Sequence, residues 1–254
     1  MRTGESPVVS NHPSRPLVSV VTVVFNGAAH LEQTITSVLD QSYDRIEYIV
    51  LDGGSTDGSV DIIRKYESRI AYWASRRDSG MYYAMNEGIE RSHGEIVGII
   101  NSDDWYEPQA IERVVEAYLA SDRQSVIYGG MRYFDADSFD MILSYDHRKL
   151  PSRMINHPSC FVPRVLYDRY GRFDTRYRIA ADYDLLLRFF RNNVGFVHLD
   201  GILSNFRHGG YSMAHSSVPE VLAIRMDHGY IGRGQYWVRR LMSRVRRAVT
   251  RPSA

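Results

Sequence analysis

The sequence predicts an α/β fold: a single domain with a mostly parallel central sheet, helices on both faces of the sheet and an amphipathic helix at the C-terminus. Short β-branched runs alternate with segments of helical periodicity over roughly the first 120 residues, a pattern typical of a parallel sheet. The runs are apolar throughout, as strands covered on both faces are. Hydrophobic residues make up 44% of the 254 residues, enough for a substantial core.

The pattern is most regular in the first half of the chain. Leu17–Phe25 (LVSVVTVVF) is the first predicted strand. The helix after it carries apolar residues at i, i+4, i+7 and i+8, counted from Leu31. Further strands are predicted at Ile46–Leu51, Ile70–Ser75 and Glu95–Ile100, and further helices at Val60–Tyr66, Tyr83–Arg91 and Pro108–Leu119.

After about residue 125 the pattern becomes less regular. Strands are predicted at Val126–Tyr133, Phe139–Tyr145, Phe196–Leu199 and Ile202–Phe206, and helices at Arg164–Tyr170 and Asp182–Asn192. The first two of these strands could pair as a hairpin. Residues 1–16 are polar and hold three prolines, so we expect them to form a disordered leader.

Composition excludes several classes of protein. A net charge of +1 argues against a nucleic-acid or polyanion binder. The single cysteine, Cys160, excludes a disulfide framework and fits a reducing compartment. No apolar run approaches the roughly 20 residues of a transmembrane helix, and the first 16 residues lack the apolar core of a signal peptide. We therefore expect a cytoplasmic protein.

Polar loops follow four predicted strands at their carboxyl ends. In open parallel sheets these ends share one edge, where ligands bind. The loops read Phe25-Asn26-Gly27, Asp52-Gly53-Gly54-Ser55-Thr56-Asp57-Gly58, Arg77-Asp78-Ser79-Gly80 and Asn101-Ser102-Asp103-Asp104. Three of them carry acids, and all are rich in glycine, serine or asparagine. The sequence therefore predicts a ligand site at this edge.

The adjacent carboxylates of Asp103 and Asp104 are the sharpest feature of this edge. They repel each other beside an apolar strand. A hard cation such as Mg²⁺ or Mn²⁺, bound through one or two carboxylates plus substrate phosphates, would offset them. The alternative is that Asp104 only caps the helix near Pro108 or a turn before it. Asp52 has an alternative too, because Asp-Gly-Gly is good turn chemistry.

Taken in order, these motifs resemble those of the inverting glycosyltransferase family 2, which has the GT-A fold. The matching stretches are VSVVTVVFN, SVLDQSY, IEYIVLDGGSTDGS, RRDSGMYYAMNEGI, GEIVGIINSDDWY, GRFDTRYRIAADYDLLLR and FRHGGYS. Each is common alone, but the ordered set spans about residues 17–210 and is specific. Within the family, the sequence is most similar to enzymes of bacterial surface-polysaccharide assembly.

The resemblance implies a role for each matching residue. On the donor nucleotide it places Thr22, Phe25 and Asn26 in the pocket, Asp52 on the base (usually uracil), Asp78 and Asn86 at the nucleotide edge, and Asp103 on the ribose. For the metal on the diphosphate it implies Asp104. His208 is a second candidate metal ligand, because Gly209, Gly210 and Ser212 beside it are typical of a loop that closes over phosphate, and a purely structural role for it is also open. Asp182 aligns with the catalytic base that deprotonates the acceptor hydroxyl.

The implied reaction is an inverting transfer of a sugar from a nucleotide-diphosphate donor, UDP-linked in most of the family, with Mg²⁺ or Mn²⁺ as cofactor. The acceptor would be a hydroxyl of a saccharide or of a lipid-linked acceptor in cell-surface polysaccharide synthesis. Residues 17–125 would form the donor-binding half, and residues 126–227 the acceptor-binding and catalytic half.

The chain departs from its relatives at a few positions. Many relatives have glutamate where this chain has Ala181, which makes Asp184 a rival base, although at i+2 on a helix it should point away from Asp182. Tyr83 replaces an acid found in close relatives. His157 falls in a segment expected near the acceptor, where a structural and a functional role are both open.

Two other functions compete with this interpretation. A sugar nucleotidyltransferase usually needs a glycine-rich loop with lysine or arginine after the first strand, and residues 26–29 lack one. A non-catalytic nucleotide-sugar-binding protein would not need Asp103, Asp104 and Asp182 together. A dinucleotide-binding oxidoreductase is weaker still, since no G-x-G-x-x-G follows the first strand.

Residues 228–254 form a basic amphipathic tail. They include no acidic residue, and arginines stand at 233, 239, 240, 244, 246, 247 and 251. Trp237, Leu241, Val245 and Val249 recur every four residues. Such a helix can lie on an anionic membrane, and it can equally be a solvated face with one packed seam. The first alternative predicts a peripheral protein on the inner face of the cell membrane.

Overall fold

The computed structural model describes residues 15–135, 139–209 and 217–250, and within these ranges nine strands form one sheet. The order is β3-β2-β1-β4-β8-β6-β9-β5, with β7 paired to β6. Nearly all of the predicted leader, residues 1–16, lies outside the described residues. Among the helices of the described ranges, none has the length and apolar character to cross a membrane.

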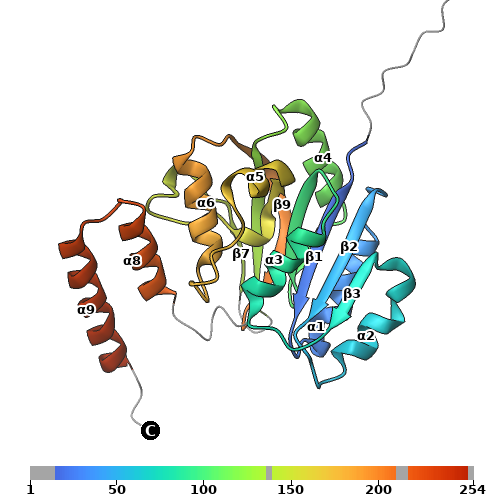
Figure 1. Ribbon diagram of the computed structural model, residues 1–254, viewed down its shortest axis with the longest axis horizontal. Helices are drawn as coiled ribbons and strands as arrows, with labels where there is room; N and C mark the ends of the chain where they lie inside the picture. Colours follow the sequence, from blue (N-terminus) through green and yellow to red (C-terminus); the bar gives the residue numbers. More distant parts are fainter. Residues whose placement is uncertain (1–14, 136–138, 210–216, 251–254) are drawn as a thin grey trace, which may run out of the picture.

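The first half of the sheet is parallel, as predicted (Figure 1). Its strands are β1 (Val18–Val24), β2 (Ile46–Asp52), β3 (Tyr72–Ser75) and β4 (Ile96–Asn101). Its helices are α1 (Ala28–Leu39), α2 (Ser59–Lys65) and α3 (Met81–Arg91), and the 3₁₀ turn η1 (Glu67–Arg69) precedes β3. β1 is buried along its whole length between β2 and β4, which explains its continuous apolar sequence.

The second half of the sheet mixes directions. Its strands are β5 (Trp105–Tyr106), β6 (Val126–Asp135), β7 (Phe139–Leu143), β8 (Cys160–Pro163) and β9 (Phe196–Arg207). Its helices are α4 (Ala110–Ala120), α5 (Arg164–Tyr170) and α6 (Ala181–Arg191), with 3₁₀ turns η2 (His147–Lys149) and η3 (His157–Ser159). β6 pairs in parallel with β9, and antiparallel with β7 and β8. The predicted β6–β7 hairpin is confirmed.

The prediction of two separate strands at Phe196–Leu199 and Ile202–Phe206 is wrong. They form one strand, β9, with a register shift where Gly129 and Gly130 of β6 meet it. Gly201 takes a positive φ of 85° at this irregularity, which lets the strand continue past it. Strand β8 escaped prediction because it has four residues and ends at a proline.

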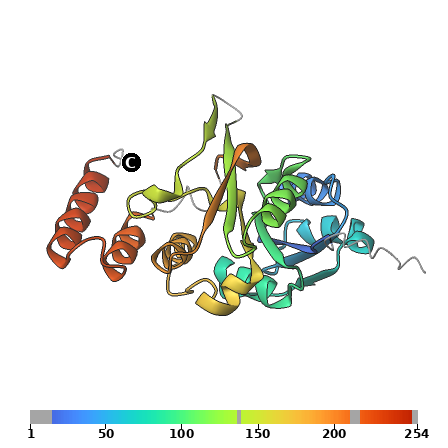
Figure 2. The same ribbon diagram turned by 90° about the horizontal axis from the view of Figure 1, so that it is seen from above.

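Two helical layers cover the sheet, one on each face (Figures 1 and 2). Alternate residues of β1 divide between them: Val21 and Val23 pack with α3, α5 and α6, while Val20 and Val24 pack with α1, α2 and α4. The alternation follows from the two-residue period of a strand. The predicted α/β fold with helices on both faces of the sheet is therefore confirmed.

Helices α8 (Val218–Asp227) and α9 (Arg233–Thr250) lie at one end of the molecule, opposite α2 and β3 (Figure 1). Helix α8 packs against α6, and α9 packs against α8. Leu222, Ile231 and Tyr236 form a small separate core between the two helices. The predicted C-terminal helix is present, and α8, which the sequence analysis did not predict, joins it to the body.

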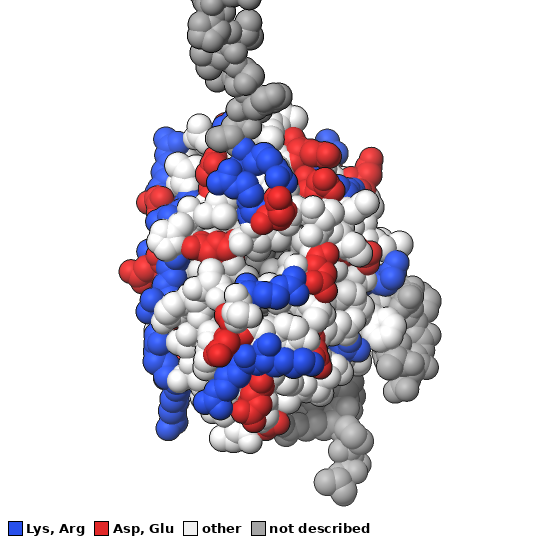
Figure 3. Space-filling view, turned by 90° about the vertical axis from the view of Figure 1, so that its right-hand side faces the viewer, with Lys and Arg blue, Asp and Glu red and all other residues white. Residues whose placement is uncertain are grey.

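The face at the α2–β3 end carries charges of both signs, interspersed (Figure 3). Lys65 of α2 pairs with Glu32 of α1 at 2.5 Å, and Arg64 pairs with Asp61 within α2 at 3.2 Å. These pairs are exposed, so each contributes little stability.

Replacing Gly88 with alanine should destabilise the fold. A Cβ at Gly88 of α3 would lie 2.3 Å from Cγ1 of Val21 in β1, so the helix would have to move away from the sheet. We expect the free energy of unfolding, measured in urea, to fall by about 1–3 kcal/mol. Gly234→Ala is the matched control, because a Cβ at Gly234 would meet no atom of the described residues within 4 Å, its chain neighbours and the backbone of its own helix apart. Unchanged stability of G88A would contradict the close α3–β1 packing.

Candidate active site

The carboxyl ends of β1, β2 and β4 meet at one edge of the sheet, as predicted. In the parallel register Val24 lies opposite Asp52, and Val23 lies opposite Asn101. The amide of Gly53 donates to the carbonyl of Val24 at 2.9 Å, which continues the pairing into the loops. The polar loops of the sequence therefore form one surface.

Asp52 is buried at this edge, and its carboxylate holds its own turn. Oδ2 accepts hydrogen bonds from the amides of Gly54 and Ser55, both at 3.0 Å, and from the Ser75 hydroxyl at 2.6 Å. Oδ1 accepts from the Ser55 hydroxyl. Asp52 therefore does stabilise the Asp-Gly-Gly turn, and through Ser75 it also joins the loop after β2 to the end of β3.

Phe25, Gly53 and Asp78 form a shelf beside Asp52. The Phe25 ring is 67% exposed at the end of β1, although it is a large apolar side chain. A Cβ on Gly53 would lie 3.0 Å from Oδ2 of Asp78 and 3.4 Å from the Phe25 ring. An exposed aromatic face with a carboxylate next to it can stack a planar base and accept from the base's N–H groups.

Asn26 braces two loops at this edge. Its φ is 50°, in the left-handed region that asparagine tolerates. Its amide donates to the Ser55 hydroxyl at 2.8 Å, and its side-chain oxygen accepts from the amide of Thr56 at 3.0 Å. Asp57 adds a third link by accepting from the amide of Ala28 at 2.9 Å. The loops after β1 and β2 are therefore fixed to each other.

Two residues expected at the nucleotide lie elsewhere. Thr22 is fully buried inside β1, and its hydroxyl accepts from the Tyr48 hydroxyl at 3.0 Å. The side-chain amide of Asn86 exchanges two hydrogen bonds, both 2.9 Å, with the backbone of Phe173. The structure does not bring either side chain to the shelf. Asn86 instead anchors the segment that leads to α6.

The acid pair follows β4 directly. Asp104 is fully buried, and its Oδ1 accepts from the amide of Arg207 at 3.0 Å. Its Oδ2 is buried with no hydrogen-bond partner among the described residues. Burial, and then the neighbouring charge of Asp103, raise the pKa of Asp104 well above its ordinary value. Burial also raises the pKa of Asp103, against the opposing effects of His30 and Arg207.

The idea that Asp104 only caps the next helix is wrong. Helix α4 begins at Ala110, and its N-cap residue is Gln109. Asp104 has a backbone role instead, because its carbonyl accepts from the Thr34 hydroxyl of α1 at 2.7 Å. The carboxylate is thus a buried acid that is short of compensating charge, which is what a divalent cation supplies.

His208 follows Arg207 at the end of β9. Its amide donates to the carbonyl of Phe134 at 2.8 Å, and its ring packs on Tyr133 with 5.6 Å between centroids. In the part of the chain that the structure describes, no three His, Cys, Asp or Glu side chains are grouped closely enough to hold a metal ion. A cation at this edge could be held by the two carboxylates together with substrate oxygens, and the role of His208 as a further ligand stays a prediction.

Asp182 lies in the first turn of α6. Its Oδ1 accepts from the amide of Tyr183 at 2.8 Å and from the hydroxyl of Tyr82 at 3.1 Å. Burial raises the pKa of Asp182, and the nearby His157 opposes the shift. Tyr82 lies two residues after the Asp78–Gly80 loop, so Asp182 is close to the same edge of the sheet as the shelf. The sequence analysis missed Tyr82, although it lies within the quoted GMYYAMN stretch.

Asp182 borders an open pocket. Three structural elements supply the wall, namely the η2–η3 segment, the start of α6 and helix α8. The lining residues are Ser152, Arg153, Met154, Ile179, Ala180, Asp182, Tyr183, Ser217, Val221 and Arg225. A carboxylate with a raised pKa on the wall of an open pocket is a candidate general base.

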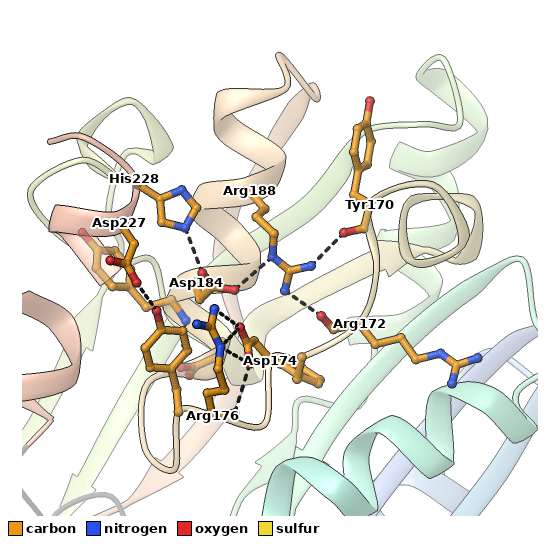
Figure 4. Close-up of polar contacts among 12 residues, drawn as sticks. Tyr170, Arg172, Asp174, Arg176, Asp184, Arg188, Asp227 and His228 are labelled. Carbon is orange, nitrogen blue, oxygen red and sulfur yellow. Dashed lines mark hydrogen bonds and ion pairs between the residues drawn. The ribbon is translucent and has the colours of Figure 1, made fainter. Parts of the chain in front are cut away.

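Asp184, the rival base, is already paired (Figure 4). Its carboxylate accepts from Arg188 Nε at 2.9 Å and lies 2.8 Å from Nε2 of His228. Arg188 in turn donates to the carbonyls of Tyr170 and Arg172. Asp184 therefore clamps α6 to the loop after α5 and to the end of α8, and Asp182 is left as the acid of the pocket.

His157 is placed beside Asp182 and packs edge-on against Phe173, with 5.7 Å between ring centroids. Burial lowers the pKa of His157, and the Asp182 carboxylate opposes that shift. Burial therefore favours the neutral form of both groups, and the attraction between their charges opposes it.

Comparison with known proteins agrees with this geometry. The model of glycosyl transferase family 2 matches residues 19–171, which is more than half of the chain. An uncharacterized glycosyltransferase of Mycobacterium tuberculosis is 35% identical over 181 residues, covering 69% of each chain. TuaG of Bacillus subtilis, named for teichuronic acid biosynthesis, is 39% identical over 105 residues, covering 40% of this chain and 42% of its own.

Solved structures share the fold at low identity. TarS of S. aureus (residues 1–349, with UDP-GlcNAc) superposes with a TM-score of 0.69 at 17% identity, covering 84% of this chain and 66% of the TarS chain. The mannosyltransferase PcManGT of Pyrobaculum calidifontis, with GDP-Man and Mn²⁺, gives 0.62 at 19% identity, covering 85% and 62%. The chain thus spans slightly less than two thirds of each of these two structures.

The fold and the acid-bearing edge of the sheet define a glycosyltransferase of GT-A type. The chain belongs to glycosyl transferase family 2.

Removing the charge of Asp104 and of Asp184 should change stability in opposite directions. The folded pKa of Asp104 is raised above its unfolded value, so its ionisation opposes folding as pH rises through the folded pKa. In metal-free buffer near neutral pH, Asp104→Asn should raise the free energy of unfolding by about 1 kcal/mol. Asp184→Asn weakens the buried contacts of Asp184 with Arg188 and His228, and should lower the free energy of unfolding by about 1–3 kcal/mol. Equal destabilisation in urea melts would show that Asp104 is already compensated.

Proposed function

We propose that the protein is an inverting, metal-dependent glycosyltransferase. It moves a sugar from a nucleotide-diphosphate donor, UDP-linked, to a hydroxyl of a saccharide or lipid-linked acceptor in cell-surface polysaccharide synthesis. The observation that carries this proposal is Asp182. Its carboxyl group has a raised pKa and borders an open pocket. It also accepts a hydrogen bond from Tyr82, which follows the Asp78–Gly80 loop beside the shelf.

The shelf of Phe25, Gly53 and Asp78 supports a nucleotide donor. The base would stack on the exposed Phe25 ring, close to the backbone of Gly53, where no Cβ intervenes. Asp78 would accept from an N–H of the base, and Asp52 would keep the loop in place through its own turn. The TarS and PcManGT structures contain UDP-GlcNAc and GDP-Man respectively, which makes a nucleotide sugar the reasonable donor class here.

The acid pair supports a divalent cation, Mg²⁺ or Mn²⁺. Such an ion would be held by Asp103 and Asp104 and would stabilise the charge that develops on the leaving diphosphate. The unpartnered Oδ2 of Asp104 and the repulsion between the two like-charged carboxylates fit an ion of this type. PcManGT was solved with Mn²⁺, which supports the same assignment.

Asp182 would act as the general base. Inversion requires the acceptor hydroxyl to attack the anomeric carbon from the side opposite the leaving diphosphate, and a base must take its proton. The raised pKa of Asp182 makes it a stronger base than an exposed aspartate once it is ionised. The hydroxyl of Tyr82 and the amide of Tyr183 fix the carboxylate, so that its Oδ2 can face the acceptor.

A sugar nucleotidyltransferase remains the second candidate on fold alone. The loop after β1 carries no lysine or arginine, and it is tied to the β2 loop by Asn26 and Asp57. A rigid loop without cations is a poor triphosphate site. The loops at this edge of the sheet therefore fit the diphosphate donor of a glycosyltransferase better than the triphosphate substrate of a nucleotidyltransferase.

Asp182→Asn should lower turnover by about 10²–10⁴-fold while donor affinity stays near that of the wild type, because only proton transfer is lost. Nucleotide release with Mn²⁺ and a panel of nucleotide sugars gives the rate, and titration with UDP gives the affinity. Asp184→Asn, assayed at a temperature where it is folded, should keep most of the turnover. If D182N turns over at the wild-type rate, the base is another residue.

Tyr82→Phe tests the same assignment through pH. The Tyr82 hydroxyl donates to the ionised Asp182 and thereby lowers its pKa, so removing the hydroxyl should raise that pKa further. The acid limb of the kcat/KM profile should then move to higher pH in Y82F. A limb that stays in place would mean that Asp182 does not control it.

Mn²⁺ together with UDP should stabilise the wild-type protein. At saturation of about 100 Kd the ligands contribute about 2.7 kcal/mol, which corresponds to a rise in Tm of about 5–10 °C for a chain of this size. Asp104→Asn should lose the part of the rise that depends on Mn²⁺, whereas Asp61→Asn, at an exposed acid of α2, should keep it. An equal rise in D104N would remove Asp104 from the metal site.

A further inference from the structure

Helix α9 leaves an apolar face uncovered. The side chains of Trp237, Val238, Leu241 and Met242 are 63%, 53%, 64% and 59% exposed. Their spacing of i, i+1, i+4 and i+5 places them together on one side of the helix. The packed side of α9 is a different one, where Tyr236 is buried against Leu222 and Ile231. The seam that a solvated tail needs is therefore already present, and the exposed apolar face is additional to it.

The charge around this face has one sign. Arg239 and Arg240 lie on the same two turns as the exposed apolar residues, and the sequence adds arginines at 233, 244, 246, 247 and 251. No acidic residue follows Asp227. An apolar face that carries a tryptophan and is surrounded by arginines complements an anionic lipid surface, with the ring among the acyl chains and the guanidinium groups at the phosphates.

A second copy of the chain is a poor occupant of this face. Pairing two α9 helices face to face would bring their arginines together with no acid of α9 between them. Like charges in contact across a partly buried interface cost several kilocalories per mole. The lipid surface has no such cost, because its own charge is opposite.

Helix α8 connects this face to the active site. The carboxylate of Glu220 accepts from the amides of Arg178, Ile179 and Ala180 at 2.9, 2.9 and 3.0 Å, just before Asp182. Arg225 donates to the hydroxyl of Tyr183 at 3.0 Å.

Two further contacts hold the C-terminal end of α8. Asp227 accepts from the Tyr177 hydroxyl at 2.9 Å, and His228 contacts the carboxylate of Asp184 at 2.8 Å (Figure 4). Val221 and Arg225 of α8 are also part of the wall of the Asp182 pocket. Helix α8 therefore connects α9 to the segment that positions Asp182, and several hydrogen bonds hold it to that segment.

We propose that α8 and α9 form a membrane-docking arm, in which Trp237, Val238, Leu241 and Met242 enter an anionic phospholipid surface. The arm carries one wall of the Asp182 pocket, so docking places that pocket at the lipid surface, where a lipid-linked acceptor would present its hydroxyl. The docking itself stands on the exposed face and its charge. Its link to the acceptor rests on the proposed function.

Sedimentation with vesicles tests the arm on the full-length protein without donor or acceptor. The wild type should bind vesicles of phosphatidylglycerol and phosphatidylcholine, bind phosphatidylcholine alone much more weakly, and dissociate as salt is raised. Trp237→Ser with Leu241→Ser should lower the partition coefficient by about 10-fold or more. Arg239→Gln should lower it by about fivefold on anionic vesicles only.

Val165→Ser is the matched control, since Val165 is an exposed apolar residue of α5, which lies outside the α8–α9 arm; it should bind as the wild type does. Asp182→Asn should also bind normally, which separates failure of the docking from failure of the proposed chemistry. Absence of wild-type binding, or equal binding by the double variant, overturns the proposal. Dimerisation seen by light scattering and abolished by W237S/L241S would assign the face to a second copy instead.

Discussion

The parallel pairing of β1 with β2 and β4 is the constraint on which the rest of this molecule depends. β1 is buried along its whole length and pairs on both sides in a register that places Val24 opposite Asp52 and Val23 opposite Asn101. Every loop after these strands then emerges at the same edge. The Asp52 turn, the Phe25 shelf and the acid pair of Asp103 and Asp104 are neighbours because of this register, although they are far apart in the sequence.

Three acids at or near this edge differ in how far neighbouring donors compensate their negative charge. Asp52 is buried but accepts four hydrogen bonds, so its charge is satisfied by its own loop and by the next one. Asp104 is buried with one oxygen unpartnered among the described residues, and its pKa is raised well above the ordinary value. Asp182 lies between these extremes, with two donors and a raised pKa. A stable turn, an acid short of positive charge and a candidate base thus come from one residue type with different degrees of charge compensation.

The second half of the chain positions Asp182 through contacts that are distant in sequence. Glu220 of α8 holds the segment before α6, Asn86 of α3 holds the loop at Phe173, and Asp184 ties α6 to His228. Two of these contacts come from α8 and its C-cap and reach the start of α6, and the third ties α3 to the segment that precedes α6. Because α8 is one of these elements, the attachment of the C-terminal helices is also part of the support of the active site.

The sequence by itself determined the parallel half of the sheet, the helices on both faces, the family and the edge where the acids gather, because apolar periodicity and strand-end motifs are local signals. It could not determine that Thr22 faces the core, that Asn86 binds backbone, or that Phe196–Arg207 is one strand, because these depend on which element packs against which. Strand β8 and helix α8 escaped prediction, β8 because it is only four residues long and α8 because it lacks strong amphipathic periodicity. The sequence already favoured Asp182 over Asp184, and the tertiary structure supplied the physical difference between them. Both acids lie on the first turn of α6, but Arg188 and His228 pair with Asp184, whereas Asp182 accepts from Tyr82 and borders a pocket.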